Sequence, residues 1–349
     1  KILATSRERL HLQSETNLFV GGMDIPDQVE SEDLLNYDAV SLFIQSACKV
    51  RPGYDPPLDE QRQIAEICQI VQGMPLAIEL AAAWLYILNV DEIAEELETG
   101  FDILATEVRD TPERHRSIHT VFDHSWSMLD QTEQEVFMRL SVFRGGYTRD
   151  AAQQVAQASL QQLAGLVSKS FLSHDPDTGR LEFHEMLRQY IQQQLDKAPE
   201  ASASALEAHA AYYAAFMGRS WENLKGARQM LAIAEIEADL ENVRAAWRFY
   251  LEQENAHQME LCVNGFREIH WIRGWNLAGM ELFAEAASQL QDKEDDESAT
   301  LHALVVSSQG YFMSWLGLSD QGYELAKQSA EILEKRNHPE ALAFAYESM

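Results

Sequence analysis

Apolar residues recur at intervals of three and four along most of this chain, which predicts a mainly α-helical protein. An early example is the face formed by Val40, Phe43 and Ala47. Two short apolar segments, residues 2–5 and 18–20, instead have the length and composition of strands. The first of them has no preceding turn or cap, so we expect the chain to begin within a domain.

Turn and cap residues divide the first helical region into elements. We expect Asp59 to be the N-cap of one helix and Gly73 to end it in the left-handed C′ position. Pro75 is expected in the first turn of the next helix, where its missing N–H costs nothing. Asp91 is the expected N-cap of the helix after that. Residues 31–110 therefore predict a small helical domain.

A second helical region ends in a β-hairpin. Asp130 and Glu133 have the spacing of a capping box. Two alternating segments flank the turn sequence Pro-Asp-Thr-Gly at residues 176–179, which is typical of a hairpin. Helices followed by a hairpin predict a winged-helix domain. Its expected helices include residues 148–157, 159–169 and 185–195.

The remaining sequence, from residue 202 onward, is helical in pattern and contains an internal repeat. Residues 274–290 align without gaps on residues 317–333, at an offset of 43 residues, and six of 17 positions are identical. This pattern predicts helical hairpins of the tetratricopeptide type, whose usual period is ~34 residues. The acidic loop DKEDDES accounts for the longer period. The last residues, 339–349, have the pattern of a further repeat that stops early.

The composition indicates a soluble, acidic protein. The 349 residues carry a net charge of -29, and acids outnumber bases in each of the three regions above. Such a surface disfavours direct binding of nucleic acid or of an anionic membrane. The longest apolar run, residues 80–88, is half of the roughly 18 residues that a membrane span needs. Three widely spaced cysteines give no disulfide framework, so we expect a cytoplasmic protein.

Motifs for catalysis are absent from the sequence. No glycine precedes a lysine, so there is no P-loop, and no serine-hydrolase, zinc-protease or dinucleotide motif occurs. His115, His119 and Asp123 have the spacing to hold a metal on one helix face. A solvated polar face is the preferred interpretation, so we predict no metal site and no catalytic residue.

Three short stretches, in a fixed order, resemble one protein family. They are TSR at residues 5–7, GMPLA at 73–77 and FHEMLRQY at 183–190. In this order they resemble the C-terminal part of a bacterial STAND signalling ATPase, the group that includes NB-ARC proteins. Three more stretches are similar to the bacterial branch of the group, namely RLSVFRGGYT, LVSKSFL and IEADLENVRAAW.

The resemblance implies a chain of four parts. The fold is then mainly α, with the remnant of an α/β nucleotide-binding domain in front. The parts are residues 1–30 for that remnant, 31–113 for the helical domain, 114–200 for the winged helix with its hairpin wing, and 201–349 for the tetratricopeptide-like repeats.

The resemblance also implies a nucleotide site. Arg7, which follows Thr5 at the end of the strand, matches the arginine that senses the terminal phosphate. Gly73 and Pro75 match a motif whose proline packs on the nucleotide. His184 matches a histidine at the diphosphate of ADP. Each assignment has an alternative. Arg7 is then a surface arginine, Pro75 belongs to a plain interhelical turn, and His184 pairs with a neighbouring glutamate. Glu185 replaces the family's aspartate, which leaves the contacts of that acid open.

The implied mechanism is a switch between ADP and ATP, with Mg in the full-length protein. ADP holds the domains closed, and exchange for ATP releases the winged helix and allows self-oligomerisation. Members of the family are slow ATPases. This chain lacks the Walker A and Walker B motifs, so we expect no tight nucleotide binding and no activity from it alone.

The partner is expected on the helical repeats, as a protein or small-molecule inducer. Aromatic residues there are candidates for core packing or for ligand contact; they are Tyr212, Tyr213, Trp247, Trp271 and Trp315. Two alternatives remain open. One is a plain protein-interaction scaffold. The other is a winged-helix transcriptional regulator, although its presumed recognition helix, residues 159–169, carries one positive charge and suits burial better than a DNA groove.

Overall fold

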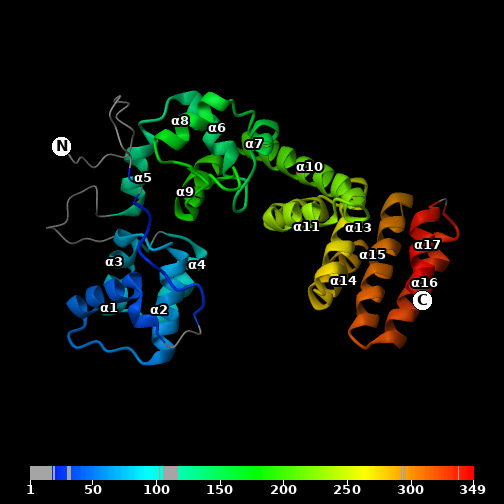
Figure 1. Cartoon of the computed structure of the whole chain (residues 1–349), viewed down its shortest axis with the longest axis horizontal. Helices are drawn as coiled ribbons and strands as arrows, with labels where there is room; N and C mark the ends of the chain where they lie inside the picture. The colour runs from blue at the N-terminus through cyan, green and yellow to red at the C-terminus, as the bar shows by residue number, and fades with distance from the viewer. Residues whose placement is uncertain are drawn as a thin grey trace. The chain divides into compact units, whose positions relative to one another are not determined.

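A computed structural model of the chain describes residues 18–349, apart from residues 19, 30–32, 102, 105–116, 292, 294 and 337. Helices dominate the described part, which contains one two-stranded sheet (Figure 1). The prediction of a mainly α fold is therefore confirmed. The expected strand at residues 18–20 is wrong, because Leu18 and Val20 lie outside any strand and are 85% and 89% exposed. The expected strand at residues 2–5 lies outside the described residues.

Contacts divide the chain into two compact units. Unit 1 combines Lys1–Ser141 with Gln157–Pro199, and unit 2 combines Val142–Ala156 with Glu200–Met349. This division places the segment Val142–Ala156 with the repeats, whereas the order of motifs along the chain placed it in the winged helix. The chain therefore passes between the units three times.

The first part of unit 1 is a small helical domain with a continuous apolar core. Helix α1 packs on α3, and α2 packs on α4. Phe43, Ile64, Ile78 and Ile93 are fully buried between them. The elements are η1 (Leu34–Asn36), α1 (Asp38–Val50), α2 (Leu58–Ile70), α3 (Pro75–Ala83), η2 (Trp84–Tyr86) and α4 (Val90–Thr99).

Two of the expected helix caps are wrong. The N-cap of α2 is Pro57, and Asp59 lies in the first turn, where it pairs with Arg62 at 3.4 Å. The N-cap of α4 is Asn89, whose side chain accepts the N–H of Glu92 at 2.9 Å and completes a capping box. Both helices begin earlier than expected, because an acidic residue is as favourable in the first turn as at the cap.

The second part of unit 1 has the winged-helix elements that the sequence predicts. The capping box at Asp130 and Glu133 is confirmed. The hairpin is antiparallel, with Ser173 opposite Glu182. Phe137 lies at the centre of this core, 5.2 Å from the ring of Phe171. The elements are α5 (Ile118–Trp126), α6 (Gln131–Leu140), α8 (Leu160–Ser168), β1 (Ser173–His174), β2 (Leu181–Glu182) and α9 (Glu185–Asp196).

Unit 2 consists of helices, and the repeat predicted from the sequence is present in it. Helices α14 and α16 each begin two residues after a glycine, Gly274 and Gly317, at the predicted offset. The elements are α7 (Arg149–Ala156), α10 (Pro199–Leu224), α11 (Gln229–Ala238), α12 (Leu240–Glu252), α13 (Ala256–Arg273), α14 (Asn276–Leu290), α15 (Asp296–Trp315), α16 (Ser319–Leu333) and α17 (Pro339–Glu347).

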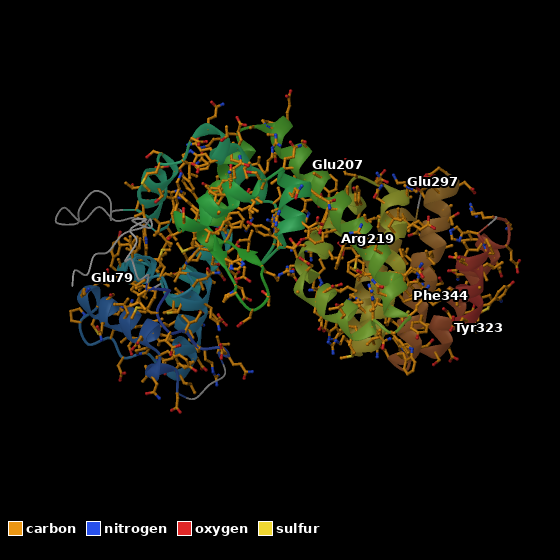
Figure 2. All side chains as sticks on the ribbon, turned by 45° about the horizontal axis from the view of Figure 1, so that its top comes forward. Glu79, Glu207, Arg219, Glu297, Tyr323 and Phe344 are labelled. Carbon is orange, nitrogen blue, oxygen red and sulfur yellow. The ribbon has the colours of Figure 1, made fainter. Side chains whose placement is uncertain are left out.

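Small residues explain why α15 and α16 pack so closely. A Cβ atom at Gly310 would lie 2.7 Å from the carbonyl oxygen of Gly322, and one at Gly322 would lie 2.5 Å from that of Gly310. The two backbones are therefore in direct contact. Tyr323 and Phe344 mark α16 and α17, the last two helices of unit 2 (Figure 2).

Candidate functional site

The turn between α2 and α3 holds two consecutive residues in the left-handed region. Gln72 has φ 50° and Gly73 has φ 66°. The N–H of Gly73 donates to the carbonyl of Cys68 at 2.9 Å, and that of Gln72 donates to the carbonyl of Gln69 at 2.9 Å. These two bonds form a Schellman motif, in which Gln72 occupies C′ and Gly73 occupies C″. The expected position of Gly73 is thus wrong by one residue.

Gly73 is required for a different reason, which is the close approach of another segment. The N–H of Met23 donates to the Gly73 carbonyl at 2.8 Å. A Cβ atom at Gly73 would lie 2.3 Å from the carbonyl oxygen of Met23, and one at Gly22 would lie 2.2 Å from that of Gln72. Gln69 adds a side-chain bond to the carbonyl of Pro26 at 2.6 Å. The turn is therefore fixed against residues 22–26.

Pro75 is the first residue of α3, as predicted. Its ring is exposed, whereas Ala77 and Ile78 behind it are fully buried. Pro75 thus presents a rigid apolar surface beside the N-terminus of a helix, where backbone N–H groups have no partner within the helix.

His184 is the N-cap residue of α9. Its Nδ1 atom is buried and has no hydrogen-bond partner, and burial lowers the pKa of the ring while Glu185 raises it by a smaller amount. The preceding residue, Phe183, stacks on Phe137 with ring centres 5.3 Å apart, which holds the start of the helix in place. The Nδ1 atom of His184 is therefore not paired with a neighbouring glutamate.

The two turns meet, although 113 residues separate them. The N–H of Glu185 donates to Oε1 of Gln72 at 3.3 Å. The carboxylate of Glu185 accepts from Arg188 at 2.9 and 2.7 Å. Glu185 therefore has well-defined contacts despite its extra carbon. The turn that contains Gly73 and Pro75 thus contacts, through Gln72, the first residue of α9, which follows His184. Thr5 and Arg7 lie outside the described residues, so their place at this site stays a prediction.

Sequence reasoning missed Gln72, Arg188 and Ser141. Arg188 Nη1 donates to the carbonyl of Ser141 at 3.1 Å. The spacing of Glu185 and Arg188, three residues apart on one helix, is a detectable signal for an ion pair. Nothing local marks Gln72 or Ser141, because their partners are distant in sequence.

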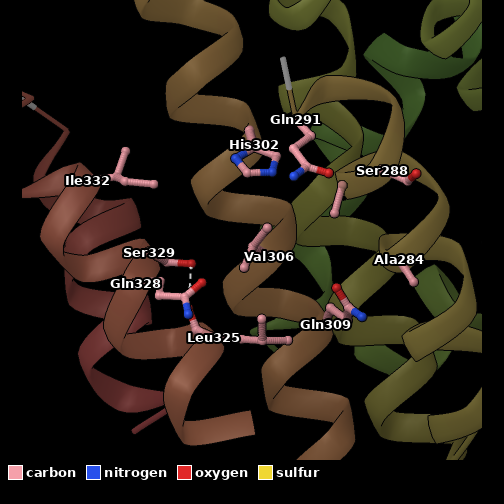
Figure 3. Close-up of a pocket in the computed structure, with 11 residues that line it drawn as sticks. Ala284, Ser288, Gln291, His302, Val306, Gln309, Leu325, Gln328, Ser329 and Ile332 are labelled. Atoms are coloured by element: carbon pink, nitrogen blue, oxygen red, sulfur yellow. Dashed lines mark hydrogen bonds between the residues drawn. The ribbon is translucent and has the colours of Figure 1, made fainter. Parts of the chain in front are cut away.

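A pocket of about 270 Å³ lies in unit 2 among α14, α15 and α16 (Figure 3). Amide groups come from Gln291 at the C-cap of α14, Gln309 of α15 and Gln328 of α16, and Val306 and Ile332 supply apolar surface. Among the described residues that line it, none is Asp, Glu, Lys or Arg. Burial lowers the pKa of His302, which also lines the pocket, so its ring is neutral near pH 7. The pocket is therefore uncharged and rich in hydrogen-bonding groups.

The five aromatic candidates of the repeats fall into two groups. Tyr213 and Trp247 are fully buried in the core, and the hydroxyl of Tyr212 donates to Asp150 at 3.1 Å. Trp271 and Trp315 are 44% and 58% exposed, so they remain available for contact with a partner.

Two kinds of site do not occur in the part of the chain that the structure describes. No group of three His, Cys, Asp or Glu side chains is placed to hold a metal ion. His115 lies outside the described residues, and Asp123 accepts a hydrogen bond from Tyr190. None of the described helices combines the length and the apolar character that crossing a membrane requires.

Comparison with known proteins finds relatives, although no family model matches. Over 332 residues the chain is 31% identical to a protein of Mycobacterium bovis that is named as a candidate HTH-type transcriptional regulator. A protein of Mycobacterium tuberculosis with the same description matches equally. These alignments cover 92% of this chain and 36% of each relative, so the chain spans about a third of their length.

Two further matches are more distant. An uncharacterised protein of Mycobacterium tuberculosis is 30% identical over 212 residues, which is 58% of this chain and 51% of that protein. Among solved structures, the chain is similar to a signal transduction ATPase with numerous domains and a tetratricopeptide repeat sensor, from Pyrococcus horikoshii. That match has a TM-score of 0.34 and 15% identity and covers 89% of this chain and 43% of the other.

Proposed function

We propose that this chain is the helical, winged-helix and repeat part of a nucleotide-controlled STAND switch that regulates transcription. The observation that carries the proposal is the contact between Gln72 and Glu185, which joins the Gly73–Pro75 turn to the His184 turn. The names of the mycobacterial relatives support regulation of transcription as the output.

The residues present fit the diphosphate of ADP. His184 has a buried Nδ1 without a partner, and a buried polar atom costs roughly 1–3 kcal/mol until it is paired. The low pKa of His184 keeps the ring neutral, so it donates one N–H without adding a charge. Bound ADP supplies the anionic oxygens that accept from such a donor. In this proposal Pro75 would pack on the nucleotide, Gly73 would shape the turn, and Thr5 and Arg7 would belong to the same site. Arg7 would bind the terminal phosphate when ATP, with Mg in the full-length protein, replaces ADP.

The repeats are the proposed place of the inducer. The pocket among α14, α15 and α16 suits a small uncharged molecule, because a charged one would find no counter-ion there and a wholly apolar one would leave the glutamine amides unpaired. Trp271 and Trp315 offer exposed surface for a protein partner. Self-oligomerisation on activation and a cytoplasmic location belong to the same proposal.

Direct DNA binding by this winged helix is disfavoured. Lys169 follows α8, the presumed recognition helix, and its ammonium group bonds both carboxylate oxygens of Glu133 at 2.8 and 2.7 Å. An ion pair of this kind leaves little free charge for a phosphate backbone. In this proposal the DNA-binding part lies outside these residues. Gel shifts at low salt with this chain test the point, and sequence-specific binding would favour the alternative of a winged-helix regulator.

The decisive experiment uses the full-length gene product. We expect it to contain a P-loop and to bind ADP, and His184→Ala is expected to weaken that binding about tenfold or more, the value of one hydrogen bond to a charged group. His174→Ala is the matched control, because His174 is exposed on the hairpin. Equal ADP affinity in both variants and the parent would contradict the proposed role of His184.

The chain by itself gives a second test. Without Walker A and Walker B it is expected to show neither ATP hydrolysis nor sub-micromolar ATP binding in isothermal titration. A full-length product without a P-loop would instead favour the plain scaffold.

A further inference from the structure

A charged side chain within unit 2 also has a buried polar atom without a partner. Arg267, on α13, is 8% exposed, and its Nη1 atom is buried without a hydrogen-bond partner. None of the ion pairs between described residues includes this arginine. Burial lowers the pKa of Arg267 to about 10, so the side chain still carries its charge near pH 7. A buried charge is costly unless it is paired, which indicates that a partner is expected here.

Aromatic rings from three other helices gather at this guanidinium group. The ring centre of Phe344 on α17 (Figure 2) lies 3.6 Å from Cζ of Arg267. The ring centre of Trp221 on α10 lies 5.9 Å from the same atom. Tyr311 on α15 contacts Phe344, with ring centres 5.7 Å apart. The four helices α10, α13, α15 and α17 all belong to unit 2.

The contact with Phe344 leaves the hydrogen-bond donors of Arg267 unused. A guanidinium group is planar, and its N–H bonds point outward in that plane. A ring centre 3.6 Å from Cζ covers the flat face of the group and stabilises its charge. The donors at the edge are not paired by this contact. Two oxygens in one plane fit such an edge, and a carboxylate has that geometry.

The charged side chains near Arg267 limit the charge of a ligand. Lys225 adds a second positive charge, with its ammonium nitrogen 3.4 Å from the ring centre of Trp221. Glu268 and Glu347 are close enough to raise the pKa of Arg267 through their negative charges. A ligand with one negative charge can pair with Arg267, whereas further negative charges on it would be repelled by the two glutamates. A single carboxylate is therefore favoured over a phosphate group.

The walls of the site indicate what the rest of the ligand should be. Trp221, Tyr311 and Phe344 are each half-buried, so part of each ring faces solvent. Trp315, which follows Tyr311 by one helical turn, is 58% exposed and has its ring centre 6.4 Å from that of Tyr311. Aromatic surfaces bind apolar groups and shield a neighbouring ion pair from water, which strengthens the pair. The site thus suits an apolar group beside the carboxylate.

We propose that Arg267, with the rings of Trp221, Tyr311 and Phe344, forms a binding site for a carboxylate carried by an apolar group. The carboxylate accepts hydrogen bonds from the edge of the guanidinium group, and the apolar group lies against the rings. Rotation of the half-buried Phe344 side chain gives access to the buried Nη1 atom. A small organic acid and a protein C-terminus with an apolar last residue both offer this chemistry.

This site is separate from the uncharged pocket among α14, α15 and α16, because none of its residues lines that pocket. Binding at Arg267 does not depend on nucleotide. Its use as a signal that reaches the switch rests on the proposed function.

Isothermal titration of phenylpropionate into the 349-residue chain, without nucleotide, tests the site. Phenylpropanol is the control ligand, because it keeps the apolar group and lacks the carboxylate. Arg267→Met is expected to weaken binding of the acid about tenfold or more, which corresponds to the loss of a hydrogen bond between charged groups. Arg273→Met is the matched control variant, because Arg273 lies on the same helix and is paired with Glu237. It should leave the affinity unchanged.

Glu347→Gln distinguishes a site for an anion from a site for a cation. Removing this exposed negative charge should strengthen binding of phenylpropionate about two- to fivefold, the range of exposed charge pairs. Weaker binding would contradict the proposal.

A short peptide that ends in phenylalanine, with a free or an amidated C-terminus, separates the two sources of the carboxylate. Tighter binding of the free peptide than of phenylpropionate identifies a protein C-terminus as the ligand, and weaker binding identifies a small acid.

The proposal is overturned if neither phenylpropionate nor the free peptide binds at millimolar concentration. It is also overturned if phenylpropanol binds as well as the acid, or if Arg267→Met binds the acid as tightly as the parent. Should Arg267→Met fail to fold in thermal unfolding, Arg267→Lys keeps the charge but loses the planar fork, and it should still bind more weakly. ADP affinity of the full-length protein is measured separately, so failure of this site and failure of the proposed function are distinguishable.

Discussion

Two histidines, one in each unit, are shielded from water but differ in their hydrogen bonding. In unit 2, His209 is 3% exposed, pairs with Asn242 and meets the aromatic rings of Phe143 and Tyr213. In unit 1, His184 is half-buried at the start of α9, and its Nδ1 atom is buried without a partner. A satisfied buried histidine holds a fold together, whereas an unsatisfied one indicates a place where a partner is expected.

The largest effect should come from the turn at Gln72 and Gly73, which contacts the start of α9. Gly73→Ala places a Cβ atom 2.3 Å from the Met23 carbonyl at a residue with φ 66°. Clash and backbone strain together should lower the free energy of unfolding by about 3–4 kcal/mol. Gly53→Ala is the control, because Gly53 has φ 78° but open space around it, and should cost about 1–2 kcal/mol. Urea denaturation followed by tryptophan fluorescence measures both, and equal costs would refute the close approach.

The second effect is the pH dependence of stability that His209 should cause. The pKa of His209 is lowered from 6.5 to about 4, mainly by burial and to a smaller extent by Arg144, against smaller opposing effects of Asn242 and Asp239. As the pH falls, His209 therefore becomes protonated near pH 6.5 in the unfolded chain but only near pH 4 in the folded chain. The stabilisation is complete above pH 6.5 and falls as the pH drops toward 4, by about 3 kcal/mol in total. The free energy of unfolding is measured against pH for the parent and for His209→Gln, and the difference between the two curves isolates the contribution of His209. Parallel curves would contradict the assignment to His209.

The smallest effect is expected at His184. His184→Leu removes a polar atom that has no partner, so the free energy of unfolding should change by less than about 1 kcal/mol, or rise. His209→Leu, by contrast, breaks a buried contact with Asn242 and should destabilise clearly. Thermal unfolding of the two variants compares them directly. A large loss at His184 would mean that this ring is structural.

Local patterns in the sequence predicted the elements that depend on neighbouring residues. The capping box at Asp130 and the hairpin follow from short-range signals, and the 43-residue offset of the repeats follows from similarity between two segments of the chain. The misplaced caps at Asp59 and Asp91 have the same origin, because several acidic residues near a helix start satisfy one pattern equally well. Choosing among them depends on where the preceding loop enters the helix.

The contacts of the candidate site could be predicted only in part. The positions of Gly73, Pro75 and His184 were marked by resemblance, but the reason for Gly73 is Met23, which lies 50 residues earlier. The bonds from Glu185 to Gln72 and from Arg144 to Asn242 span 113 and 98 residues. Contacts of this range follow from the packing of whole domains, and no local periodicity encodes them.

The placement of Val142–Ala156 in unit 2 has a consequence during synthesis of the protein. Phe143 and Tyr147 leave the ribosome long before α10 and α12, which cover them. Asn242 follows Tyr147 by 95 residues (242 − 147), a delay of roughly 5–19 s at ~5–20 residues per second. Until then two large aromatic side chains lack part of their native cover, so this segment exposes apolar surface during synthesis.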